Sequence, residues 1–212
     1  MIDMTSSRSV AGSGTVSKLQ MAFSRSIKPL HRWLRSATRS DLMAIDRMTS
    51  QLDLARREDY GLFLNVHYWT LNALSPYWRE EDRIDFLALA ECLQGDMHSL
   101  GFAASNPDPV LHSPMTADHS LGISFVIRGA RFGSNTLRDR ISPRFSARYL
   151  DFSPALSWPC FLRQLEQHVL NRLPQDGCPT VISGAKQALG AFSNGLRLIL
   201  HSAPFCATSH GV

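Results

Sequence analysis

The chain has 212 residues, 44% of them hydrophobic, which is enough for one globular domain with a sizeable core. Its formal net charge is +4, but the basic excess falls within residues 1–32 and the rest of the chain is neutral overall. A neutral body without a basic stripe excludes nucleic acid as the expected partner. No apolar run approaches the roughly 18 residues that a membrane span requires.

The ends of the chain differ in composition from its middle. Residues 1–27 are rich in serine, glycine and arginine and predict a disordered basic tail. A helical domain is predicted over residues 28–205, followed by a short C-terminal tail over residues 206–212. The four cysteines form no CxxC pair, which disfavours a zinc site. We interpret them as thiols of a protein in the reducing cytoplasm.

Apolar residues recur at three- and four-residue steps along most of the domain, which is the spacing of amphipathic helices. The proline-containing stretches 101–117 and 143–157 predict a loop and an irregular segment. No convincing strand-like alternation and no internal repeat is present. The sequence therefore predicts an all-α, single-domain, multi-helix fold. The predicted helices cover residues 34–52, 57–74, 79–95, 118–140, 158–173 and 180–201.

Two glycines, Gly129 and Gly133, stand four residues apart within an otherwise helical stretch. Glycine costs about 1 kcal/mol relative to alanine inside a helix, so a pair on one face requires a reason. One interpretation is close packing of a second helix. The other is the approach of a flat ligand to the helix backbone. The pattern alone leaves both open.

Several segments, taken in order, resemble the bacterial heme oxygenases. Residues 126–134, VIRGARFGS, look like the distal helix of that family, where a Gly-x-x-x-Gly segment lies over the heme. Residues 34–46, LRSATRSDLMAID, are similar to the proximal pattern Leu-x-x-Ala-Thr-x-x-x-His-x-x-x-Asp/Glu. The YxxFLxxH segment of residues 60–67 resembles the second helix of the family. The stretches that begin at Trp158 and Ala185 resemble its last two helices.

The resemblance spans about residues 30–200 and implies the all-helical heme oxygenase fold. It implies oxidative opening of heme to biliverdin, carbon monoxide and iron, with electrons from an external reductase as redox partner. Heme would be both substrate and ligand. The residues expected at such a site are Gly129, Gly133, Ala130, Thr38 and Arg35, with Arg35 paired to a heme propionate at the rim. A solvated surface arginine is the alternative for Arg35.

The main departure from the family lies at Leu42. Four residues after the threonine the family has the histidine that ligates iron, and leucine has no lone pair to offer. His67 is the candidate substitute ligand, although a polar core histidine is the other interpretation. Ala130 also departs, since many members have a polar residue there, and Ser134 replaces a frequent third glycine.

Three functions remain open at this point. The chain is an active heme oxygenase with weak or substituted ligation, or a non-catalytic member that binds heme, another tetrapyrrole or a bilin. The third possibility is a helical interaction module that kept the fold and lost the pocket, because fold alone does not fix function. Leu42 argues against the first function, and the glycine pair argues against the third.

Overall fold

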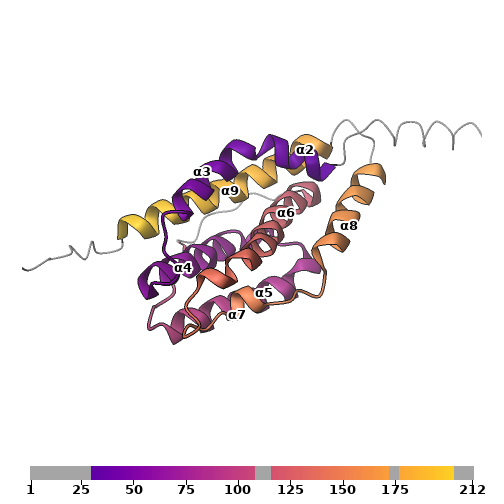
Figure 1. Ribbon diagram of the computed structural model, residues 1–212. Coiled ribbons are helices and arrows are strands. Elements are labelled where there is room, and N and C mark those ends of the chain that lie inside the picture. The colour runs from indigo at the N-terminus through magenta and orange to yellow at the C-terminus, as the bar shows by residue number, and fades with distance from the viewer. Residues whose placement is uncertain (1–29, 108–115, 172–176, 203–212) are drawn as a thin grey trace, which may run out of the picture.

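The computed structural model describes residues 30–107, 116–171 and 177–202 (Figure 1). Helices and connecting segments account for these residues, and no strand occurs among them, which confirms the all-α prediction. Both predicted tails, 1–27 and 206–212, lie outside the described residues. No helix in the described part of the chain is long and apolar enough to cross a membrane.

The helix boundaries agree with the sequence pattern to within a few residues, with three exceptions. The predicted helix 118–140 is α-helical only as far as Ser134 and continues as a 3-10 helix over residues 135–140. The first predicted helix is divided at Thr38, whose φ of −109° and ψ of 5° leave the α-helical region. The predicted irregular segment 143–157 contains a single helical turn. The elements are α2 (Leu30–Ala37), α3 (Arg39–Thr49), α4 (Arg57–Ala73), η1 (Ser75–Tyr77), α5 (Glu80–Ser99), α6 (Ala117–Ser134), η2 (Asn135–Arg140), α7 (Arg148–Asp151), α8 (Trp158–Asn171) and α9 (Gly177–Ser202).

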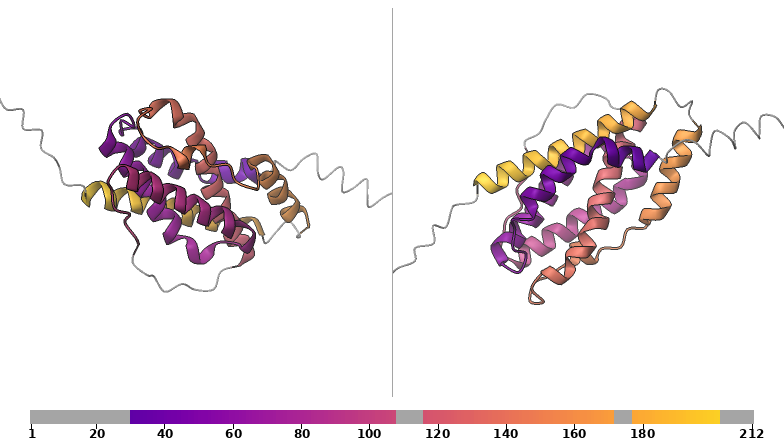
Figure 2. Two further views of the ribbon diagram at one scale, coloured as in Figure 1. Left: turned by 90° about the horizontal axis from the view of Figure 1, so that it is seen from below. Right: turned by 45° about the horizontal axis from the view of Figure 1, so that its top comes forward.

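Helix α9 is the longest helix of the described residues and runs alongside α2 and α3 on one side of the molecule (Figures 1 and 2). It contacts α2, α3, α4 and α6, while α5 packs on α4 and α7, and α8 packs on α2 and α6. The inward stripe predicted for α9 is buried throughout, because each of its members is at most 7% exposed. These members are Val181, Ala185, Ala188, Phe192 and Leu196.

Helices α6 and α9 touch through their backbones. A Cβ atom added at Gly122 would lie 1.9 Å from the carbonyl oxygen of Val181. One added at Gly184 would lie 1.9 Å from the carbonyl oxygen of His119. No side chain fits in either place, so this glycine pair sets the crossing of the two helices.

We expect Gly184→Ala to lower the free energy of unfolding by about 1–3 kcal/mol, because the new methyl group would overlap the His119 carbonyl oxygen. Gly190→Ala is the matched control on the same helix, since a Cβ there meets no described atom within 4 Å. The control should gain about 0.5–1 kcal/mol from helix propensity. Urea unfolding followed by circular dichroism measures both. Equal midpoints for Gly184→Ala and the unchanged chain would contradict the close crossing.

Candidate functional site

The C-terminal half of α6 presents two opposite faces. At about 100° per residue, Gly129, Ala130 and Gly133 point to one side of the helix, and Arg128 and Arg131 point to the other. Both arginines are buried, whereas Gly129 and Ala130 are half-buried and Gly133 is exposed. We call the first side the glycine face and the second the arginine face.

The glycine face is not covered by a closely packed helix. A Cβ atom at Gly133 would meet no described atom within 4 Å. At Gly129 its nearest neighbour would be the indole of Trp158, with Cη2 at 3.4 Å. This environment differs from that of Gly122, where the backbone of α9 leaves no space. The close-packing interpretation of the glycine pair at 129 and 133 is therefore not supported by the geometry.

Helix α3, which contains Leu42, has no fully buried residue. Leu42 and Ile45 are half-buried and pack against the core, so Leu42 lies on the inward side of α3. At the α2–α3 junction Thr38 is fully buried, and its hydroxyl donates to the Leu34 carbonyl oxygen at 2.7 Å. Arg35 is exposed on α2 and forms no ion pair with a described residue.

Ala130 also lines a small recess of about 10 Å³, whose polar groups come from His67, Thr70 and Tyr149. The hydroxyl of Tyr149 lies 2.9 Å from Nδ1 of His67 and 3.4 Å from Oγ of Ser134. Burial, together with the nearby charge of an arginine on the other side of α6, holds the pKa of His67 well below its usual value. His67 is therefore neutral at physiological pH. No residue of α3 lines this recess.

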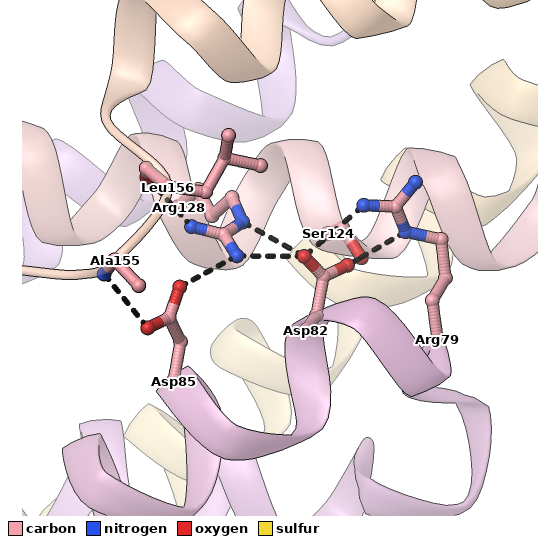
Figure 3. Close-up of polar contacts among 7 residues, drawn as sticks. All are labelled: Arg79, Asp82, Asp85, Ser124, Arg128, Ala155 and Leu156. Carbon is pink, nitrogen blue, oxygen red and sulfur yellow. Dashed lines mark hydrogen bonds and ion pairs between the residues drawn. The ribbon is translucent and has the colours of Figure 1, made fainter.

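On the arginine face, a buried ionic network ties α6 to α5 (Figure 3). Arg128 donates from Nε and Nη2 to Oδ1 of Asp82 at 3.0 and 2.7 Å, and from Nη2 to Oδ2 of Asp85 at 2.9 Å. Oδ2 of Asp82 accepts from Arg79 at 2.7 Å and from the Ser124 hydroxyl at 2.5 Å. The Arg128 side chain is 4% exposed, and that of Asp82 is fully buried. Every charge in this network has a partner, as burial requires.

The same network fastens the chain segment that leads into α8. The backbone N–H of Ala155 donates to Oδ1 of Asp85 at 2.9 Å, and Nη1 of Arg128 donates to the carbonyl oxygen of Leu156 at 3.0 Å. Figure 3 shows both contacts on the side of Arg128 away from Asp82. Two helices and one connecting segment are thus joined at a single guanidinium group.

A half-open cavity of about 250 Å³ lies on the arginine face, between α5, α6 and residues 152–159. Its walls are mainly apolar and include Phe86, Ile127 and Phe132. The charged groups of Arg128 and Asp85 in its lining already bond to each other. The polar groups of the ionic network are therefore used for structure, and the glycine face is the better candidate for a ligand.

The ionic network cannot be predicted from the sequence pattern, although the sequence contains one signal of it. Arg128 follows an apolar run in α6, and an arginine on a buried helix needs an acidic partner. Its partners lie 43 and 46 residues away in the sequence, so the pattern could not identify them. Among the described residues, no three His, Cys, Asp or Glu side chains converge as a metal site.

The network predicts a specific pH dependence. Burial raises the pKa of Asp82, but hydrogen bonds from Arg79 and Ser124 and the charges of Arg79 and Arg128 outweigh it, so the pKa falls below its usual value. A carboxyl whose folded-state pKa is lowered contributes stability that is fully present above about pH 5 and is lost as the pH falls through the folded pKa.

We therefore expect Asp82→Asn to lose about 3–5 kcal/mol at neutral pH and to show a flatter decline of stability between pH 5 and the acid-unfolded state than the unchanged chain. Asp151→Asn is the control, because its ion pair with Arg138 is exposed and should contribute about 0–1 kcal/mol. Urea unfolding at a series of pH values measures all three. Parallel pH profiles for Asp82→Asn and the unchanged chain would contradict the assignment.

No known family model and no curated protein sequence matches the chain. Its structure is similar to that of the heme oxygenase from Neisseria meningitidis, solved in NO- and CO-bound forms. The TM-score is 0.67 at 17% sequence identity, and the match covers 88% of this chain and 99% of that one. An identity this low carries no residue roles with it. Over most of its length, the chain has the all-helical fold of that heme oxygenase.

Proposed function

We propose that this chain binds heme, or a tetrapyrrole of similar shape, between the glycine face of α6 and the inward side of α3. One observation carries the proposal: Gly133 leaves open space near the end of α6, whereas Gly122, near the start of the same helix, is closed by the backbone of α9. The similarity to a heme oxygenase fold supports the class of ligand.

The residues present fit a flat macrocycle better than they fit its iron. Glycine lets a ligand approach the backbone, and the half-buried Leu42 and Ile45 would add apolar contact worth about 25 cal/mol per Å². Leu42 has no donor atom for iron. When bound, iron would supply the redox chemistry, and the protein would hold the ring and exclude water. Arg35, which is exposed on α2, would pair with a propionate group of the ligand.

His67, the substitute ligand suggested by the sequence, has surroundings that favour a different role. Its Nδ1 is bonded to the Tyr149 hydroxyl, and its recess lies behind Ala130 with no contribution from α3. We infer that His67 supplies a neutral polar group behind the glycine face. Thr38 would fix the corner between α2 and α3.

Oxidative ring opening, with electrons from an external reductase, is the activity that the fold suggests. Leu42 opposes it, because the iron would lack an imidazole on the α3 side. We therefore propose binding without efficient turnover as the native function. An interaction module without a site is not favoured, because such a module has no need for an open glycine face.

The first test is a hemin titration of Gly133→Leu, followed by the Soret absorbance. The leucine should occupy the ligand's place and weaken hemin binding by about tenfold or more, at a cost of at least 1.4 kcal/mol. Because the site is exposed and open, the helix content and unfolding midpoint should not fall. Gly190→Leu is the control, since it makes the same change at another open helical glycine. Equal hemin affinity in both variants would reject the glycine face as the binding surface.

The second test is Leu42→His. If Leu42 lies beneath the iron, the native hemin complex should lack a proximal imidazole, and the variant should gain a histidine-ligated spectrum and faster conversion to biliverdin with a generic reductase. Without heme the variant should lose about 1–3 kcal/mol, because a polar ring replaces leucine at a half-buried apolar position. Ala44→His, on the exposed side of α3, is the control and should change neither the spectrum nor turnover. A histidine-ligated spectrum in the unchanged chain would show that another residue holds the iron.

A further inference from the structure

The indole of Trp158 lies at the boundary between the two faces of α6. Its Cη2 is 3.4 Å from the position that a Cβ at Gly129 would take. On the other side the ring stacks on Phe132, with centroids 5.9 Å apart and an interplanar angle of 19°. A second stacked contact joins it to Phe161 at 5.7 Å and 19°. Trp158 thus stands at the Gly129 end of the glycine face, while the Gly133 end is open.

The backbone that carries Trp158 is fixed before it reaches α8. Arg128 bonds to the Leu156 carbonyl oxygen, two residues before the indole. On the same side of α6, Nη2 of Arg131 donates to the carbonyl oxygen of Leu150 at 2.7 Å and to that of Phe152. The guanidinium groups of α6 therefore hold the segment 150–156 at several points along its length.

The ring itself is also held in place. Phe161, on which it stacks, is fully buried and lies under the guanidinium groups of Arg79 and Arg128, at 5.7 and 5.5 Å from the ring centroid. Phe125 contacts the indole from α6, with the ring centroids 5.5 Å apart. A side chain packed on three aromatic rings and carried by a fixed backbone cannot swing aside cheaply.

We propose that Trp158 is the end wall of the tetrapyrrole site and determines which macrocycles the site admits. This inference rests on the proposed function. A ring with small edge groups, such as methyl and vinyl, would fit against the indole. A macrocycle with bulky aryl groups on its edge would meet a wall that does not move, and the site would reject it.

The test compares the affinities of two probes, hemin and an iron tetrakis(sulfonatophenyl)porphyrin, in each variant. The unchanged chain should prefer hemin, and Trp158→Ala should shift the affinity ratio toward the aryl porphyrin by about tenfold or more, as expected when a pocket wall is removed. Trp33→Ala is the matched control, because Trp33 is 51% exposed on α2, and it should leave the ratio unchanged. An unaltered ratio in a folded Trp158→Ala variant would overturn the inference.

A second measurement uses the unchanged sequence, so it does not depend on the folding of the alanine variant. The chain is labelled with 5-fluorotryptophan, the resonance of Trp158 is assigned from Trp158→Phe, and zinc protoporphyrin is added. The ring current should shift the Trp158 fluorine resonance and leave that of Trp33 in place. Binding without a Trp158 shift would overturn the inference alone. Failure of hemin to bind the unchanged chain at all would overturn the proposed function as well.

Discussion

The ion pair between Arg128 and the two aspartates of α5 is the interaction on which the arrangement of this molecule's candidate site depends. It is buried, and its charges are matched by Asp82, Asp85 and Arg79, so the loss of one partner would leave a charge without water or a counterion. It joins α5, α6 and the segment before α8 at one point. Together with the backbone contact between α6 and α9, it fixes the orientation of the glycine face, and it anchors the segment that leads to Trp158.

Helix α6 uses glycine for two different purposes. Near its start, Gly122 removes a side chain so that the backbone of α9 can approach. Near its end, Gly133 removes a side chain where no described atom lies within 4 Å, and at Gly129 only the indole of Trp158 comes near. The same residue type in the same helix thus sets a structural contact at one end and leaves an open surface at the other. Only the tertiary structure distinguishes the two, because the spacing of glycines in the sequence is compatible with either use.

The sequence predicted the helices well because burial of one face imposes a three-to-four residue period, and that period is local. The division at Thr38 escaped prediction because a change in the φ and ψ angles of one residue leaves the apolar spacing intact. The same spacing did not show that Ile84, in the predicted third helix, is 81% exposed while Leu93 is buried. The contact between Trp158 and Gly129 joins residues of different helices, and no local pattern records such a pairing. In the candidate site, the inward position of Leu42 was predictable from the sequence, but the position of Trp158 beside Gly129 was not.

The backbone contact between α6 and α9 has a consequence for how the molecule accommodates ligands of different thickness. Where two backbones touch, no rotamer change can alter the spacing between the helices, so α6 is a fixed reference surface. Helix α3 also contacts α9, but none of its apolar side chains is more than half-buried, and the chain bends just before it at Thr38. At the proposed site, adjustment to a ligand's dimensions would therefore fall to α3, as a change in tilt about that bend, while α6 would keep its position.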